Sequence, residues 1–281
     1  MKLAMVRVDG SARPAVMDSD GALVDLKACG MVHWENLDEL IAAGEDVWRE
    51  AADAAARDYP RLSDPELLVP LSSPQKIMCI GRNYADHARE LGHDLPEHPV
   101  LFAKYANALA GPGDEIVLPG VSREIDYEAE LAVVIGKRCK AVDRDAALDC
   151  VFGYTCANDI TMRDAQKADG QWTRAKSPDT FCPLGPWLVS ADEIPDPQAL
   201  AIALELNGEV MQDSSTAEMV FGVAELVSYL SQTMTLLPGD LLLTGTPPGV
   251  GAGRDPQVFL DSGDKLKVKV ERIGELENRV R

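Results

Sequence analysis

Four carboxylates stand at alternate positions of the segment REIDYEAELAVVIG, residues 123–136: Glu124, Asp126, Glu128 and Glu130. Alternation with a period of two predicts a β-strand with one polar and one buried face. Carboxylates two apart on such a face lie about 7 Å apart and repel one another. The strand continues as LAVVIG, apolar on both faces, and a carboxylate that enters a buried strand needs a counter-charge. A hard divalent cation such as Mg²⁺ or Mn²⁺ would supply it.

The simplest alternative is that the acidic run is the solvated face of an edge strand, as most acidic runs are. Two features argue against it: the buried continuation, and the lack of any basic residue in the run beyond Arg123. A further acid, Asp159, has a similar setting at the end of the predicted strand FGYTCANDI. Asp159 is therefore a candidate to share a cation with the run.

Three of the four histidines, His87, His93 and His98, fall within a short window. Their spacing fits neither the i, i+4 pair of an HExxH helix nor a zinc finger, so we do not expect zinc. His87 and Glu90 stand at i and i+3, where a helix would bring the side chains within hydrogen-bonding distance. A carboxylate that holds an imidazole raises its basicity and prepares it to take a proton from water. From the residues alone, an ordinary surface pair is the simpler interpretation.

The elements that must position these residues predict a β-rich α+β fold in two parts. Residues 1–72 are predicted to form a small N-terminal α/β domain, with two strands around the turn DSDG, one or two alanine-rich helices and a proline-rich linker. Residues 73–281 are predicted to form the larger domain. Its expected elements, in chain order, are the strand KIMCIGRNY, the helix NYADHARELGH, the strands DEIVLPG, YEAELAVVIG and FGYTCANDI, the helix TMRDAQKAD, the hairpin ALAIALELNGEVMQ, the helix FGVAELVSYLSQTM and the strands DLLLTGTPPGVG and DKLKVKVERIG.

The charge balance limits the partners of the chain. With 46 acidic and 27 basic residues, the formal net charge is −19, which argues against nucleic acid and anionic membranes as partners. An acidic substrate would be repelled at long range, so a metal or a few placed cations must recognise it locally. We expect neither a signal peptide nor a membrane span. Six scattered cysteines without a CxxC pair indicate reduced thiols and a cytoplasmic protein.

The segment TGTPPGVGAG, residues 244–253, has the glycine content of a phosphate-binding loop. It lacks the Gly-Lys-Ser/Thr ending of such a loop, and its two prolines remove amide donors that a phosphate cradle would need. We therefore interpret it as a turn that ends a strand.

Four motifs in the same order and with similar gaps resemble the fumarylacetoacetate hydrolase family: DYEAELAVVIGK, NDITMRDAQ, QWTRAKSPDTFCPLGPW and LLLTGTPPGVG, with GRNYADHARE upstream. The resemblance runs from about Lys76 to the C-terminus. The leading segment resembles the small N-terminal domain of the longer bacterial members. The chain is similar to acylpyruvate and fumarylpyruvate hydrolases and to 2-hydroxyhepta-2,4-diene-1,7-dioate isomerases. The resemblance implies a mixed, β-roll or barrel-like catalytic domain and a homodimer.

The resemblance also assigns roles to residues of this sequence. Metal ligands for one Mg²⁺ or Mn²⁺ would be Glu128, Glu130 and Asp159, with three carboxylates leaving positions open for water and substrate. Asp126 would then support the site from outside the ligand shell, and Glu124 would be ordinary surface charge or a further support.

For catalysis, the resemblance implies that His87, on a mobile lid and oriented by Glu90, activates a water molecule, while Lys176 lies near the metal. Arg163, Gln166 and Thr246 would bind substrate. Lys104 stands at the place of a family lysine that is usually followed by proline. Here Tyr105 follows it, a departure that concerns the shape of the pocket nearby.

We therefore expect a divalent-metal hydrolase that cleaves a carbon–carbon bond in 2,4-diketo acids such as acylpyruvates or fumarylpyruvate, including sugar-derived and aromatic-catabolic intermediates. A same-family decarboxylase of oxaloacetate-type acids, a dehydratase of sugar acids, or an isomerase of 2-hydroxyhepta-2,4-diene-1,7-dioate is the alternative, since the metal motif cannot separate these reactions. A non-catalytic Ca²⁺-binding protein is a third hypothesis, which a placed base and lysine oppose.

Overall fold

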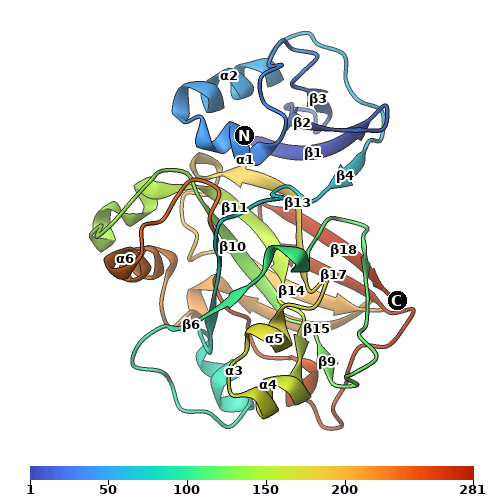
Figure 1. The fold of residues 1–281 in the computed structure, drawn as a ribbon, viewed down its shortest axis with the longest axis vertical. Coiled ribbons are helices and arrows are strands. Elements are labelled where there is room, and N and C mark those ends of the chain that lie inside the picture. Colours follow the sequence, from blue (N-terminus) through green and yellow to red (C-terminus); the bar gives the residue numbers. More distant parts are fainter.

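The N-terminal part of the computed structural model, which describes residues 1–281, is a small layer of strands and helices at one end of the molecule (Figure 1). Its elements are β1 (Lys2–Val8), β2 (Ser11–Met17), β3 (Leu23–Asp25), α1 (Leu37–Ala42), α2 (Glu45–Ala55) and β4 (Glu66–Leu68). The two helices agree with the sequence analysis, but the strands differ. A tight turn at Asp9 and Gly10, both with positive φ, adds strand β2, which we had not predicted. Strand β4 lies inside the segment predicted as a linker and pairs with β1.

Strand β1 connects this layer to the main sheet, because Lys2 pairs with Val189 and Leu3 with Leu188 of β13. The sheet has 11 strands, with the order β3-β2-β1-β13-β11-β10-β16-β5-β6, while β4 pairs with β1 and β7 with β13. The strands that follow the N-terminal layer are β5 (Ile77–Gly81), β6 (Val100–Lys104), β7 (Leu109–Ala110), β10 (Ala129–Ile135), β11 (Val151–Asn158), β13 (Cys182–Ser190) and β16 (Leu241–Leu243). The domain boundary at residue 72 stays a prediction.

A second sheet of five strands lies against the first, with the order β15-β14-β17-β18-β8. Its strands are β8 (Glu115–Ile116), β14 (Ala201–Leu206), β15 (Glu209–Ser215), β17 (Lys265–Val270) and β18 (Gly274–Val280). The β14–β15 hairpin turns at Asn207 and Gly208, both at positive φ, as the NG signal predicted. The sequence analysis missed β18, which closes the chain. Both sheets are open, so the mixed, strand-rich α+β fold is confirmed without a closed barrel.

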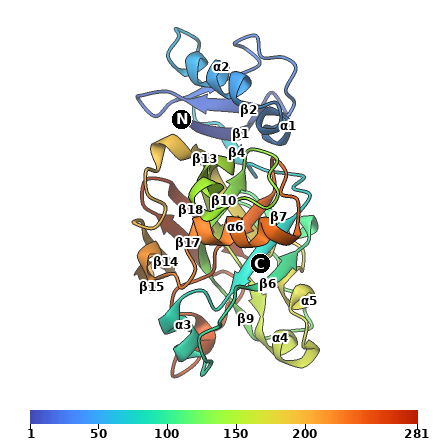
Figure 2. The ribbon, with the colours of Figure 1, turned by 90° about the vertical axis from the view of Figure 1, so that its left-hand side faces the viewer.

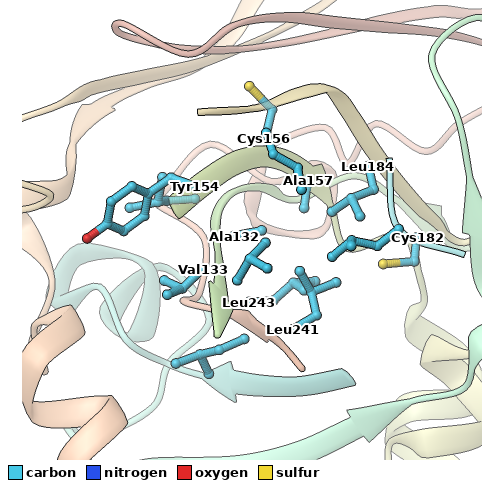
Figure 3. Close-up of a cluster of buried hydrophobic side chains, with 14 of the residues drawn as sticks. Ala132, Val133, Tyr154, Cys156, Ala157, Cys182, Leu184, Leu241 and Leu243 are labelled. Atoms are coloured by element: carbon cyan, nitrogen blue, oxygen red, sulfur yellow. The ribbon is translucent and has the colours of Figure 1, made fainter. Parts of the chain in front are cut away.

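The centre of the main sheet is buried on both faces. All seven residues of β10 and all eight of β11 are buried. Figure 3 shows the apolar side chains that β10, β11, β13 and β16 contribute to one cluster, among them Val133, Tyr154, Leu184 and Leu243. Each large apolar side chain buried in this way stabilises the fold by about 1.5–3 kcal/mol. The strands that carry the candidate site are therefore held rigidly.

The remaining helices follow the N-terminal layer in the chain, and Figures 1 and 2 both place α3 and α4 at the end opposite that layer and α6 nearer the middle of the molecule. They are α3 (Ala85–Glu90), α4 (Arg163–Asp169), α5 (Thr173–Lys176) and α6 (Val223–Thr233). The longest helices, α2 and α6, have 11 residues, and no helix is long and apolar enough to cross a membrane.

The acidic run 124–130 does not form the single strand with a polar face that its alternation predicted. It is split into β9 (Ile125–Asp126), which pairs with β12 (Thr161–Met162), and the start of β10 at Ala129. Asp126, Glu128 and Glu130 are buried, and only Glu124 is partly exposed. The alternative of a solvated acidic face is excluded for these three acids, because cations and amide donors surround them.

Candidate active site

Three carboxylates meet at the junction of β10 and β11. Glu128 directly precedes β10, Glu130 lies on it, and Asp159 follows β11. Because β10 and β11 are antiparallel, with Ala129 opposite Asn158, the start of one strand lies beside the end of the other. One oxygen from each carboxylate lies within 4.8 Å of the others, and all three residues are buried. The structure thus brings together the three acids that the sequence analysis selected.

The three carboxylates differ in how their charge is compensated. Glu128 lies 2.7 Å from Lys176 Nζ and 2.7 Å from Arg163 Nη2. Asp159 lies 2.5 Å from Lys104 Nζ and 2.8 Å from Lys176 Nζ. Glu130 forms no ion pair and accepts one hydrogen bond of 2.6 Å from the amide of Gly245.

The pKa values of the two glutamates consequently shift in opposite directions. Burial raises the pKa of Glu128, but the positive charges of Lys176 and Arg163 outweigh it and hold the pKa well below the ordinary value. Burial also raises the pKa of Glu130, and the negative charges of Asp159 and Glu128 raise it further. Glu130 is therefore the buried carboxylate that lacks a cation.

This donor set fits a hard divalent cation. The oxygens of Glu128, Glu130 and Asp159 are the ligand type that Mg²⁺ and Mn²⁺ prefer, and a cation would compensate Glu130. Burial raises the pKa of the neighbouring thiol of Cys182 to about 12, so it stays protonated and is a poor ligand. The cluster itself consists of carboxylates alone.

Two buried lysines approach the cluster from different elements. Lys176, at the end of α5, contacts both Glu128 and Asp159, whose charges outweigh the effect of burial and raise its pKa. Lys104, at the end of β6, contacts Asp159 and the carbonyl of Ile160. Tyr105, which replaces the usual proline, is 62% exposed and does not line the cavity. The Tyr105 side chain is therefore not part of the cavity lining.

Arg163, the first residue of α4, is held by three side chains. Its Nε lies 2.8 Å from Asp126, its Nη2 2.7 Å from Glu128, and its Nη1 donates to Gln166 at 3.2 Å. Asp126 also accepts hydrogen bonds from the amides of Gly251, at 2.7 Å, and Ala252, at 3.0 Å. Asp126 thus fixes Arg163 against the glycine-rich turn.

His87 and Glu90 lie on α3, with His87 Nδ1 3.3 Å from Glu90 Oε2. The other oxygen of Glu90 accepts a hydrogen bond of 3.0 Å from the amide of Gly249. With Nδ1 donating to Glu90, the imidazole has Nε2 free to accept a proton. The pair expected from the spacing in GRNYADHARE is therefore formed, and the glycine-rich turn holds it.

One cavity of about 320 Å³ connects these groups. Of the nine residues selected from the sequence, seven line it: His87, Glu128, Glu130, Arg163, Gln166, Lys176 and Thr246. The other two, Asp159 and Glu90, lie behind the lining and contact lining residues.

The cavity also contains residues that the sequence analysis did not select. Arg82, Lys167 and Trp172 line it. The hydroxyl of Tyr84 is buried nearby without a hydrogen-bond partner, and burial together with the charge of Glu130 raises its pKa. Arg82 and Tyr84 fall within the motif GRNYADHARE, which was the available signal for both.

Comparison with known proteins agrees with this geometry. Residues 76–281 match the family described as fumarylacetoacetate (FAA) hydrolase, C-terminal. The chain belongs to the fumarylacetoacetate hydrolase family. It is 45% identical over 264 residues to bovine mitochondrial oxaloacetate tautomerase FAHD2A, covering 92% of this chain and 84% of that protein. It is 44% identical over 276 residues to the 2,4-didehydro-3-deoxy-L-rhamnonate hydrolase of Sphingomonas sp. SKA58, covering 98% and 94%.

Solved structures of this family share the whole fold. The fumarylacetoacetate hydrolase of Exiguobacterium antarcticum superposes with a TM-score of 0.91 at 38% identity, covering 100% of this chain and 99% of that one. The maleylpyruvate hydrolase of Sphingobium sp. SYK-6, in complex with manganese(II) and pyruvate, superposes with a TM-score of 0.84 at 32% identity, covering 100% and 98%. The N-terminal layer is therefore included in the similarity.

Proposed function

We propose that the chain is a divalent-metal-dependent hydrolase that cleaves a carbon–carbon bond in 2,4-diketo acids of the acylpyruvate type. The observation that carries the proposal is the shared cavity, which is lined by His87, the partner of Glu90, and by Glu128 and Glu130. Two relatives support it by name, the rhamnonate hydrolase and the maleylpyruvate hydrolase, whose structure contains manganese(II) and pyruvate.

A bound Mg²⁺ or Mn²⁺, held by Glu128, Glu130 and Asp159, would supply a Lewis acid for the 2-oxo acid end of the substrate. His87 Nε2 takes a proton from water, and the resulting hydroxide adds to the carbonyl remote from the carboxylate. The bond between that carbonyl and the neighbouring CH₂ breaks, and its electron pair passes to the pyruvate fragment. His87 returns its proton to that fragment, which gives one carboxylic acid and pyruvate.

The surrounding residues have supporting roles in this proposal. Lys176 and Arg163 are buried cations beside the carboxylates, and they offset negative charge as it develops on the pyruvate fragment. Gln166 and Thr246 line the cavity and offer polar groups to the substrate. Glu90 keeps the proton on His87 Nδ1, so that Nε2 is the basic nitrogen.

Tautomerisation of oxaloacetate is the second candidate, because the bovine relative of that name is 45% identical to this chain. The same base would move one proton between carbon and oxygen, with no water added and no bond between carbons broken. We expect the same acidic site to serve the other reactions considered: decarboxylation of oxaloacetate-type acids, dehydration of sugar acids and isomerisation of dienedioates. A Ca²⁺-binding role without catalysis fits less well, because the carboxylates open into a cavity that holds a base.

A panel assay tests the proposal. Acylpyruvates, enol-oxaloacetate, oxaloacetate and 2-hydroxyhepta-2,4-diene-1,7-dioate are each incubated with the protein, with and without Mn²⁺. The expected result is Mn²⁺-dependent release of pyruvate from an acylpyruvate, reduced by about 10²- to 10⁴-fold in His87→Ala, the usual contribution of a general base. Full turnover by His87→Ala, or proton transfer in oxaloacetate without any cleavage of acylpyruvates, would refute hydrolysis as the main activity.

We also propose a homodimer in the cytoplasm. Tyr105, Pro119 and Val121 line one surface hollow, in which Val121 is 80% exposed and Tyr105 62% exposed. Exposed apolar side chains that gather in one place favour a partner surface.

The six free cysteines, five of them buried, are consistent with a reducing compartment such as the cytoplasm.

A further inference from the structure

Four cationic side chains line the active-site cavity, and one of them has no carboxylate partner. Arg163 and Lys176 each contact two buried carboxylates, and Lys167 lies 3.3 Å from Glu124. Arg82 forms no ion pair and donates no hydrogen bond to the protein. The chain has 46 acidic and 27 basic residues, so the missing carboxylate partner of Arg82 is not explained by a shortage of acidic residues.

The backbone holds Arg82 in one place. Its φ is +58°, a left-handed conformation that residues other than glycine adopt rarely and that persists only where the surroundings enforce it. The next residue, Asn83, enforces it: its side chain donates to the carbonyls of Thr244, at 2.7 Å, and Phe221, at 3.0 Å, and accepts from the amide of Phe221 at 2.8 Å. The start of the Arg82 side chain is therefore fixed at the cavity wall.

The guanidinium of Arg82 lies over an immobilised indole. Its Cζ is 5.8 Å from the centre of the Trp172 ring, a cation–π contact. Trp172 packs so closely on Gly81 that a Cβ on Gly81 would lie 2.5 Å from the ring, and it also meets the Phe102 ring at 5.2 Å. A guanidinium that stacks through its face keeps its N–H groups free at the edge for a ligand.

We propose that Arg82 binds a second carboxylate of the substrate, at the end remote from the 2-oxo acid group. The proposal rests on the proposed function, in which the buried acids and Lys176 hold the 2-oxo acid end. A guanidinium edge matches a carboxylate in a two-pronged hydrogen-bonded pair. The preferred substrates are therefore 2,4-diketo acids that end in a carboxylate, and Arg82 selects them against neutral-ended analogues.

The test compares two acylpyruvates of equal length, one ending in a carboxylate and one in a primary amide. In Arg82→Gln, kcat/KM for the acid should fall about 10- to 100-fold, as expected for the loss of one charge-assisted pair, mainly through KM. For the amide it should stay within about twofold, since no such pair is lost. Arg89→Gln is the matched control, because Arg89 is an exposed arginine on α3 that pairs with Asp86.

Calorimetry provides a readout apart from turnover. In the Mn²⁺-loaded His87→Ala protein, which keeps Arg82, the carboxylate-ended and amide-ended compounds should bind with different affinities. When Arg82→Gln is added to His87→Ala, the two affinities should be equal. Two results would overturn the proposal and leave Arg82 with a structural role: an equal loss of kcat/KM for acid and amide in Arg82→Gln, or a wild-type protein that does not prefer the acid. If wild type cleaves neither compound, the proposed function fails, and the calorimetry still decides on Arg82. Arg82→Lys, which keeps the charge, covers the case that Arg82→Gln fails to fold.

Discussion

The carboxylate of Glu90 occupies the space in which a side chain on Gly253 would lie. A Cβ on Gly253 would be 2.4 Å from both Cδ and Cγ of Glu90. Gly253 and Glu90 are far apart in the sequence. The amide of Gly249, in the same turn, donates to Glu90. The glycine-rich turn thus fixes the position of the Glu90 side chain and, through Glu90, the position of His87.

Gly253→Ala should therefore displace Glu90 and disturb the base without touching the metal site. We expect kcat for an acylpyruvate to fall about 10- to 100-fold, part of the usual contribution of a general base, while Mn²⁺ affinity is unchanged. Steady-state kinetics and Mn²⁺ titration measure the two quantities. Gly120→Ala is the control, because a Cβ there meets nothing within 4 Å. Undiminished kcat in Gly253→Ala would show that the turn does not position Glu90.

The raised pKa of Glu130 predicts how stability depends on pH in the metal-free protein. Because its pKa in the folded state lies above the unfolded value of about 4.3, protonated Glu130 favours the fold. This contribution is full below the unfolded pKa and is lost as the pH rises through the folded one. In EDTA, the Tm of wild type should therefore fall relative to that of Glu130→Gln as the pH rises above the unfolded value of about 4.3.

Added Mn²⁺ should restore the Tm of wild type and leave that of Glu130→Gln nearly unchanged, since ligand bound to the folded state stabilises it. Thermal unfolding across this pH range, with EDTA or Mn²⁺, checks both statements. Parallel Tm curves for the two proteins in EDTA would contradict the assigned direction of the Glu130 shift.

Two acids of the same run should differ in their contribution to stability. Asp126 is fully buried and accepts from Arg163, Gly251 and Ala252, so Asp126→Asn should lower the free energy of unfolding by about 3–5 kcal/mol. Glu124→Gln, which removes only a surface contact with Lys167, should change it by less than about 1 kcal/mol. Urea unfolding measures both. Similar effects of the two substitutions would refute the distinction.

The proposed dimer predicts a response to a charge on its surface. Val121→Asp places a carboxylate where Val121 is 80% exposed, and burial of that charge in an interface would be unfavourable, so the variant should be monomeric. Light scattering after gel filtration determines the mass. Val210→Asp, on the edge strand β15 and 54% exposed, is the control and should leave the mass unchanged. A monomeric wild type would exclude the dimer.

The sequence was most informative where chemistry and a short-range pattern coincide. The alternation and the buried strand that follows indicated a cation near the acidic run, and helical spacing placed His87 beside Glu90. The resemblance then selected Glu128 and Glu130 within the run and assigned a catalytic role to the His87–Glu90 pair. Asp159 was a candidate from its place at the end of a predicted strand, but its position beside Glu128 and Glu130 follows from the pairing of β10 with β11, which the sequence pattern does not record.

Other features depend on contacts between distant segments, which periodicity does not record. The split of the acidic run follows from β9 pairing with β12, which a continuous alternating pattern conceals. The seat of Glu90 on Gly253 and the left-handed Arg82 held by Asn83 are likewise contacts across the fold. For these, the residue types were visible in the sequence, but their neighbours were not.

The pairing of β1 with β13 has a consequence for solubility. Strand β13 has β11 on one side, and on the other β1 covers Leu188 and Val189. A version of the chain without residues 1–72 would expose these apolar residues along an unpaired strand edge, a template for pairing with other chains. The N-terminal layer thus protects this edge from aggregation, in a sheet whose central strands β10 and β11 carry the acids of the active site.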